Sequence, residues 1–237
     1  MNAANRSAAV MAQRAPGDVE GDDALRALYR RLDYFPTPPW AARAGAELIR
    51  RLDPEARTVW EPACGEGHMA EPFRTYFPTV FASDIHPHGY GEVIDFLDHD
   101  IAADGGNLQF DWIASNPPFI AAPDFIRIAQ RRTKRGVAML LRLSFLEGSG
   151  RFDVLWGDEP LTVLAPFSER VSMVLGQWDP QAGLATAYAW FIWIKGAAPM
   201  PPQPIGPGTR ARLWLPDDAA RFGAKTDAPL LAAMGGA

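Results

Sequence analysis

From residue 58 onward, short apolar segments of strand length alternate with segments of helical spacing, and this alternation is the feature that most constrains the fold. Helical spacing is found at 68–77 and 123–133, each time between two strand-length segments. Strands that alternate with helices pair in parallel, because each helix carries the chain back to the starting edge of the sheet. The pattern predicts seven strands, at 58–61, 79–83, 93–94, 111–115, 136–141, 161–165 and 186–195.

The last two predicted strands are joined differently from the others. No full helical pattern lies between residues 167 and 186, so a parallel crossover is not expected there. We therefore predict an α/β fold with a doubly wound, mostly parallel seven-stranded sheet and an antiparallel edge strand. Two helices, at 22–32 and 40–52, are predicted ahead of the sheet and are separated by a proline-rich break.

The chain of 237 residues suits one domain, and 48% hydrophobic with 22% charged residues is ordinary for a globular protein. Residues 1–21 have no periodicity and are predicted to be a flexible N-terminal arm. Residues 22–196 form the expected catalytic domain. Residues 197–237 form a C-terminal extension with five prolines between 199 and 207, which predicts a stiff linker or a wrapping arm.

Several classes of protein are excluded by composition. The single cysteine, Cys64, permits no intrachain disulfide and no cysteine-based zinc site, and a cytoplasmic location is expected. The longest apolar run, 185–194, is too short to span a membrane. His86 and His88 lack the spacing of a zinc enzyme, so no metal is predicted. The net charge of −5 argues against a non-specific nucleic-acid binder but permits contact through a local basic patch.

Polar residues stand where the predicted strands end, and in open α/β sheets ligands bind beyond these ends. The strand-end residues are Glu61, Asp84, Asp95, Asn116 and Arg142. The alternation of strands and helices therefore selects candidate site residues by itself.

The first strand end continues into an acidic glycine turn, from Glu61 through Cys64 and Gly65 to Gly67. The turn lacks the Lys-Ser/Thr pair of a phosphate-binding loop, so it suits a ligand with an ammonium group better than a phosphate. Asp84 follows nineteen positions after Gly65, the spacing of a carboxylate that binds the ribose hydroxyls of an adenosine. An ordinary strand–turn–helix connection and a turn aspartate remain the alternatives.

The next strand end supplies a candidate contact for an adenine ring. Asp95, preferred here to Asp98, is expected to accept a hydrogen bond from the adenine amino group. Phe96 or a neighbouring apolar side chain is expected to pack on the ring.

The sequence Asn116-Pro117-Pro118-Phe119 is the most informative motif. Two consecutive prolines stiffen the loop and remove backbone donors, which leaves carbonyl oxygens free to accept hydrogen bonds. Asn116 adds a side-chain carbonyl, so that two acceptors can face one amino group and make its lone pair available as a nucleophile. Phe119 offers a flat ring for stacking. A plain turn with a buried phenylalanine is the alternative.

In this order, the motifs resemble class I S-adenosylmethionine-dependent methyltransferases of the Asn-Pro-Pro-aromatic type, in particular small adenine-N6 DNA methyltransferases of bacteria and their phages. The resemblance covers residues 34–195 and implies a Rossmann-like methyltransferase fold with S-adenosylmethionine as cofactor. The segment 35–38, which matches the part of that family lying over the methionine end, adds Thr37 to the cofactor site. The implied cofactor residues are Thr37, Glu61, Cys64, Gly65, Gly67, Asp84, Ile85, Asp95 and Phe96.

The resemblance implies methyl transfer to adenine N6 in DNA, with the base swung out of its stack. Asn116, Pro117 and Phe119 are the implied catalytic residues. The remaining candidates for contact with the base or a phosphate are Pro118, Arg142, Phe145, Phe167 and Arg170. Alternatives are an RNA base, a protein glutamine amide, or a cofactor-binding regulatory protein without turnover. Fewer than fifty residues follow the last strand, so selectivity is expected from loops or the proline-rich tail rather than from a separate recognition domain.

Overall fold

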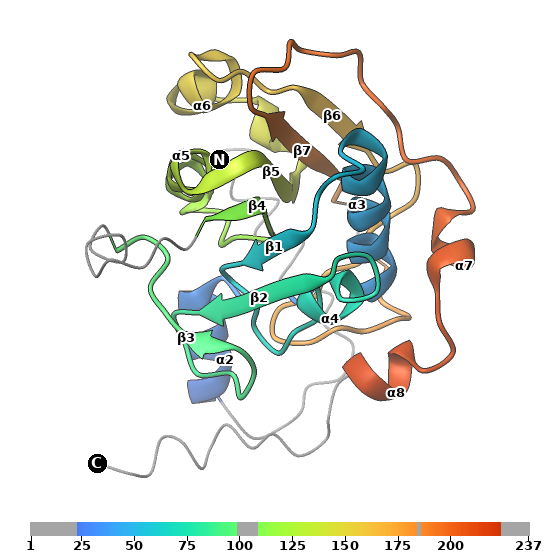
Figure 1. Ribbon diagram of the computed structural model, residues 1–237. Coiled ribbons are helices and arrows are strands. Elements are labelled where there is room, and N and C mark those ends of the chain that lie inside the picture. The colour runs from blue at the N-terminus through green and yellow to red at the C-terminus, as the bar shows by residue number, and fades with distance from the viewer. Residues whose placement is uncertain (1–22, 99–108, 184–185, 224–237) are drawn as a thin grey trace, which may run out of the picture.

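The computed structural model describes residues 23–98, 109–183 and 186–223. Its centre is one seven-stranded sheet with the order β3-β2-β1-β4-β5-β7-β6 (Figure 1). The strands are β1 (Thr58–Glu61), β2 (Thr79–Asp84), β3 (Glu92–Val93), β4 (Phe110–Ser115), β5 (Thr133–Arg142), β6 (Val163–Pro166) and β7 (Tyr188–Ile194). The predicted doubly wound α/β fold is confirmed.

Six strands run in the same direction, and the antiparallel pairing is confined to one side of the sheet, where β7 runs the opposite way. Strand β7 is inserted between β5 and β6 and is antiparallel to both. The antiparallel strand is therefore second from the edge, and β6 is the edge strand that pairs with it. This order places the carboxyl ends of β1, β2 and β4 next to one another.

Helices cover both faces of the sheet (Figure 1). They are α2 (Asp23–Leu32), α3 (Pro39–Leu52), α4 (Ala70–Phe73), α5 (Ala122–Arg132), α6 (Phe152–Trp156), α7 (Thr209–Leu213) and α8 (Asp218–Phe222), with 3₁₀ turns η2 (Leu143–Leu146) and η3 (Ser149–Arg151). The helix predicted at 68–77 is shorter than expected. Pro72 has no backbone N–H, and its carbonyl accepts a hydrogen bond from the Thr75 hydroxyl, which competes with helical pairing.

The two halves of the core lie on opposite faces of β7. Trp190 packs with α3 and α4 on one face, and its indole N–H donates to the Ala41 carbonyl at 3.2 Å. Trp193 packs on the other face, where its indole donates to the Val154 carbonyl at 3.0 Å. Gly45 lets α3 approach closely, since a Cβ there would meet the Trp190 ring at 2.3 Å.

The described part of the C-terminal extension lies against the rest of the fold. Backbone N–H groups of Met200, Gln203 and Ile205 donate to carbonyls of the β6 segment at 2.7 to 2.9 Å. The chain then reaches α3, where α7 packs and where Arg43 forms a two-point ion pair with Asp218. This segment is a wrapping arm as far as Gly223. The predicted N-terminal arm, 1–21, and residues 224–237 lie outside the described residues.

None of the helices in the described ranges is long and apolar enough to cross a membrane.

Candidate active site

A pocket of about 260 Å³ opens beyond the carboxyl ends of β1, β2 and β4. Five stretches of chain line it, including the segment that joins α2 to α3. Of that segment, only Thr37 was among the predicted site residues. Nine of the predicted site residues line this one pocket: Thr37, Glu61, Cys64, Asp84, Ile85, Asp95, Phe96, Asn116 and Pro118. The structure therefore brings the glycine turn, the strand-end carboxylates and the Asn-Pro-Pro-Phe loop to one place.

The glycine turn needs glycine for two reasons. Gly65 and Gly67 have φ of 51° and 87°, the left-handed region that side chains rarely adopt. A Cβ at Gly65 would also meet the Tyr34 ring at 2.5 Å. The Gly65 N–H donates to Asp84 Oδ2 at 2.9 Å, so the turn is fixed to the end of β2.

Asp84 holds two loops at the pocket wall. Its Oδ1 accepts a hydrogen bond from the His86 N–H at 2.9 Å, while its Oδ2 accepts one from the Gly65 N–H. Each carboxylate oxygen has two acceptor sites, so Asp84 keeps capacity for further donors such as ribose hydroxyls. The predicted ligand role and a structural role are therefore compatible.

Tyr34 and His88 form a wall beside the glycine turn that sequence reasoning missed. Their rings stack with centroids 4.6 Å apart and an interplanar angle of 29°. Burial lowers the pKa of His88 below its usual value, and the Asp84 carboxylate opposes this shift only in part. His88 is therefore neutral at neutral pH and contributes a flat surface rather than a positive charge.

Glu61, at the end of β1, is an almost completely buried carboxyl group. Ser115 Oγ donates to its Oε1 at 3.2 Å, and its Oε2 has no hydrogen-bond partner among the described residues. Burial raises the pKa of Glu61 well above its usual range, and the nearby Asp84 carboxylate adds to the shift. A cationic ligand in the pocket would relieve this cost, because it would supply the missing opposite charge.

Cys64 is expected to be unreactive in the folded protein. Burial raises the pKa of its thiol above the usual value, and the Glu61 and Asp84 carboxylates raise it further. Since the thiolate is the reactive form, iodoacetamide at pH 8 should leave Cys64 unmodified over a time in which the urea-unfolded chain is fully labelled. Mass spectrometry of the intact protein measures this. Equal labelling of folded and unfolded chains would contradict the buried placement.

The side chain of Asn116 has a fixed orientation. Its Nδ2 donates to the Phe35 carbonyl at 2.8 Å and approaches Met173 Sδ at 3.6 Å. Its Oδ1 is buried and has no hydrogen-bond partner among the described residues. A buried acceptor without a donor costs free energy. The arrangement therefore leaves an acceptor atom available for a ligand N–H.

Phe119 is half-buried in a cluster of side chains rather than free for stacking on all sides. The Arg142 guanidinium lies over its ring, with Cζ 4.2 Å from the centroid. The rings of Phe35 and Tyr188 lie 5.8 and 6.2 Å from it. A separation of 4.2 Å leaves no room for a base between Arg142 and Phe119. Arg142 therefore holds Phe119 through a cation–π contact, where we expected a side chain free to bind phosphate.

Four predicted substrate residues do not line the pocket: Arg142, described above, and Phe145, Phe167 and Arg170. Phe145 is buried at 5% exposure and packs edge-on against Phe191, because the 3₁₀ turn after β5 directs it into the core. Phe145 therefore does not present its ring to the pocket. Phe167 packs edge-on against Trp40, 5.4 Å between centroids, and Arg170 is exposed outside the pocket lining.

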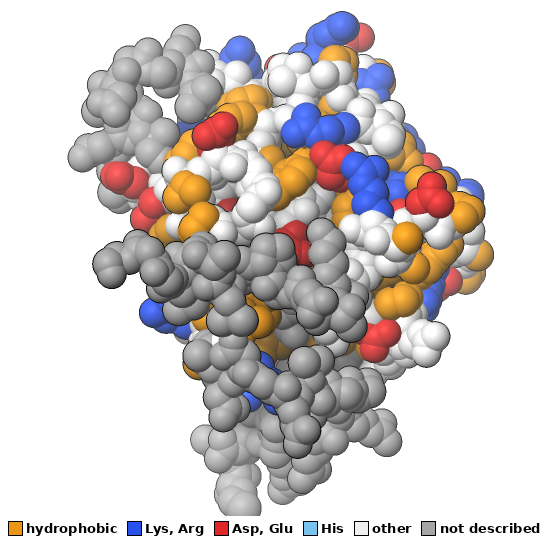
Figure 2. All heavy atoms as spheres, turned by 90° about the horizontal axis from the view of Figure 1, so that it is seen from below, with side chains coloured by type: hydrophobic (Ala, Val, Ile, Leu, Met, Phe, Trp, Pro, Cys, Tyr) orange, Lys and Arg blue, Asp and Glu red, His pale blue; other side chains and the backbone are white. Residues whose placement is uncertain are grey.

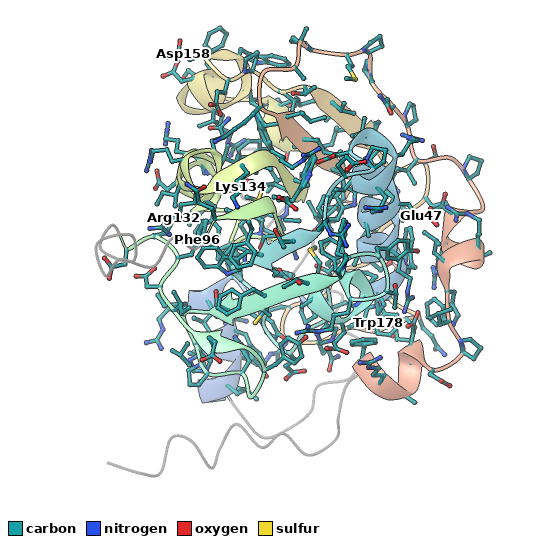
Figure 3. All side chains as sticks on the ribbon, in the orientation of Figure 1. Glu47, Phe96, Arg132, Lys134, Asp158 and Trp178 are labelled. Atoms are coloured by element: carbon teal, nitrogen blue, oxygen red, sulfur yellow. The ribbon has the colours of Figure 1, made fainter. Side chains whose placement is uncertain are left out.

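Phe96 borders the pocket from inside the core. It is 1% exposed and packs edge-on against Trp60, while the Arg132 guanidinium lies 5.2 Å from its ring centroid (Figure 3). Its ring faces are thus occupied by the protein. Ile85, 57% exposed, and Leu97 line the same pocket and offer the apolar surface that we assigned to Phe96 or a neighbour.

The described residues contain no group of three His, Cys, Asp or Glu side chains that could hold a metal ion.

No family model matches this sequence, and no curated protein matches it significantly. Solved structures are similar at low identity. A methyltransferase subunit of a type I restriction-modification system from Streptococcus thermophilus has a TM-score of 0.52 and 15% identity, over 68% of this chain and 44% of that one. A Vibrio vulnificus modification subunit, described as part of a type I restriction enzyme, has a TM-score of 0.52 and 14% identity, over 90% of this chain and 57% of that one. A Pyrococcus horikoshii protein described as an RNA methyltransferase has a TM-score of 0.52 and 16% identity, over 80% of this chain and 97% of that one.

The chain spans about half the length of the two restriction-system subunits, 44% and 57%. At these identities the likeness concerns the fold, which many functions share. The seven-stranded sheet of this chain is the Rossmann-like fold of methyltransferases.

Proposed function

We propose that this protein transfers a methyl group from S-adenosylmethionine to an exocyclic amino group, most directly N6 of adenine in DNA. The observation that carries the proposal is the buried Oδ1 of Asn116, which has no hydrogen-bond partner in the described part of the chain and lies in the pocket that Asp84 and Glu61 also line. The hydrogen bond from Asn116 Nδ2 to the Phe35 carbonyl orients Oδ1, so that Oδ1 can accept a hydrogen bond from the amino group of a substrate.

The residues present fit the cofactor. Asp84 would accept the ribose hydroxyls, Asp95 the adenine amino group, and the apolar surface of Ile85 would pack on the adenine ring. Glu61 Oε2, which is buried and has no donor among the residues that the structure describes, would face a cationic group such as the ammonium or sulfonium of S-adenosylmethionine. Thr37, 3% exposed, lines the same pocket at the expected methionine end. The cofactor, when bound, supplies a methyl group activated by the positive sulfur.

The chemistry needs little from the protein beyond positioning. Asn116 Oδ1 and the Pro117 carbonyl would accept the two amino hydrogens, which draws the nitrogen lone pair out of conjugation and directs it at the methyl group. Orientation and fixed dipoles of this kind account for much of the rate in such transfers. The amine becomes acidic as the new bond forms, so its proton leaves to water and no strong base is required.

Charge favours a brief local contact with nucleic acid over a broad basic surface. On the face shown in Figure 2, the basic side chains of the described residues are interspersed with acidic ones. Arg31, at the end of α2, lines the pocket and is exposed. It is a candidate phosphate contact at the pocket mouth.

There are two alternative substrate classes to DNA and one alternative without catalysis. An RNA base amine and a protein glutamine amide present the same –NH₂ group to Asn116, and a cofactor-binding protein without turnover would need only the cofactor half of the pocket. Two similar solved chains are subunits of restriction systems and one is described as an RNA methyltransferase, so DNA and RNA are the first pools to test.

Incubation of the protein with labelled cofactor and separate pools of candidate substrates tests the proposal. The purified protein is incubated with tritiated S-adenosylmethionine and, separately, with DNA, tRNA, rRNA and cell protein. We expect label in DNA, released as N6-methyladenine on hydrolysis. Label in the RNA or protein pool alone would refute the DNA substrate, and cofactor binding without label in any pool would refute the enzymatic function.

A further inference from the structure

Asp33 is a residue in an unusual backbone conformation beside the Asn-Pro-Pro-Phe loop. It follows the last residue of α2 and has φ of 52°, and it is the only non-glycine residue in the left-handed region among those described. The Tyr34 N–H donates to the Tyr29 carbonyl and the Asp33 N–H to the Arg30 carbonyl, the hydrogen-bond pattern of a helix end that normally carries glycine here. An aspartate at this position is strained relative to glycine.

The carboxylate of Asp33 makes the contact that glycine could not make. Its Oδ2 accepts the backbone N–H of Phe119 at 2.6 Å, a short bond typical of a charged acceptor. Pro117 and Pro118 have no N–H groups, so the Phe119 N–H is the first backbone donor in the loop after Asn116. Asp33 therefore fixes the loop at its first backbone donor after the two prolines.

The same short segment holds the other end of the loop. The Phe35 carbonyl, two residues after Asp33, accepts the Asn116 Nδ2–H at 2.8 Å. The Phe35 ring also lies against Phe119, with centroids 5.8 Å apart. The segment from Asp33 to Phe35 thus contacts both Asn116 and Phe119, and it comes from a part of the chain more than eighty residues away in sequence.

We propose that Asp33 is a positioning residue that holds the Asn-Pro-Pro-Phe loop in the geometry needed for transfer, at the cost of a strained helix end. The catalytic part of this inference rests on the proposed function. The holding of the loop does not, because it is a property of the protein without substrate. A residue that served only to end the helix would do so better as glycine.

Two substitutions separate the two roles of Asp33. Asp33→Gly fits the left-handed conformation and removes the acceptor, whereas Asp33→Asn also tolerates that conformation and keeps a side-chain carbonyl oxygen. Asp124→Asn, on the exposed first turn of α5, is the matched control for loss of an acidic group. Hydrogen exchange of the Phe119 amide, thermal unfolding, the Kd for S-adenosylmethionine and kcat are measured for each.

For Asp33→Gly we expect an unfolding temperature equal to or above that of the wild type. Its Phe119 amide should exchange about 10-fold to 100-fold faster, and kcat should fall by a similar factor with the cofactor Kd unchanged, as loss of a bond to a charged group predicts. Asp33→Asn should restore most of the amide protection and most of kcat. Asp124→Asn should leave all four measurements as in the wild type.

Unchanged exchange of the Phe119 amide in Asp33→Gly would overturn the proposal. Faster exchange with an unchanged kcat would overturn the link to catalysis. A fall in unfolding temperature together with loss of cofactor binding would show a role in folding instead. If the wild type labels no substrate pool, the proposed function fails, while the exchange measurement still decides whether Asp33 holds the loop.

Discussion

Asn116→Ala should lower kcat for methyl transfer by about 10²-fold to 10³-fold, the loss typical of removing one preorganised group that acts on the reacting atoms. The substitution removes the buried Oδ1 that has no partner among the described residues, so it removes an interaction made only with the substrate. The Kd for S-adenosylmethionine should stay close to that of the wild type, because the glycine turn and Asp84 are untouched. Single-turnover kinetics and equilibrium binding measure the two quantities.

Asn116→Asp is the informative companion variant. It keeps an acceptor oxygen in the pocket but replaces the donor that binds the Phe35 carbonyl at 2.8 Å. We expect activity between that of the alanine variant and that of the wild type, because the acceptor remains while its orientation is less well fixed. Loss of cofactor binding in Asn116→Ala, with the fold intact by circular dichroism, would mean that Asn116 belongs to the cofactor site.

Asp218→Ala should destabilise the protein by about 3–5 kcal/mol, as expected when one partner of a buried ion pair is removed. Nη1 and Nη2 of Arg43 each donate to one carboxylate oxygen of Asp218 at 2.7 Å, and the two side chains are 8% and 2% exposed. The variant leaves the Arg43 charge buried without its partner. At 2–4 °C per kcal/mol for a domain of this size, the midpoint should fall by roughly 6–20 °C. Thermal unfolding followed by circular dichroism measures it.

An exposed ion pair between the same two segments is the control. Arg212 bonds to both oxygens of Glu47, but the two side chains are 57% and 35% exposed. Glu47→Ala should therefore cost no more than about 1 kcal/mol. The double variant Arg43→Met with Asp218→Leu should recover much of the lost stability, since it buries no unpaired charge. Equal effects of Asp218→Ala and Glu47→Ala would mean that the extension is not anchored at Arg43.

The sequence was sufficient to predict the sheet and the strand ends that line the candidate pocket. Strand ends such as Glu61, Asp84 and Asn116 are found by counting, because the carboxyl ends of parallel strands meet at one edge. The strands observed at 58–61 and 110–115 lie within one residue of the prediction. Hydrophobic periodicity is a local signal, and it agrees with the observed strands where the sheet is buried on both faces.

The predicted residues that do not line the pocket and the residues that sequence reasoning missed have a common physical cause. Phe145 and Phe167 follow strands in the expected way, but which side such a residue faces depends on a 3₁₀ turn and on packing against Trp40, both of which are tertiary. Asp33 and Tyr34 reach the site from a helix end more than fifty residues before β4. The only local signal for Asp33 was an aspartate directly after the last helical leucine, and such residues are common at turns.

The arm along β6 has a consequence for how this protein behaves at high concentration. An edge strand offers unpaired N–H and C=O groups to any other extended chain and so invites aggregation. The N–H groups of Met200, Gln203 and Ile205 satisfy carbonyl groups along β6, while the residues between them include Pro201, Pro202 and Pro204, which have no N–H to offer outward. The outer edge formed by residues 200–205 therefore cannot pair with a further strand in the regular pattern. The strand at the opposite edge of the sheet, β3, is two residues long. The β6 border of the sheet is thereby closed to regular intermolecular β-pairing.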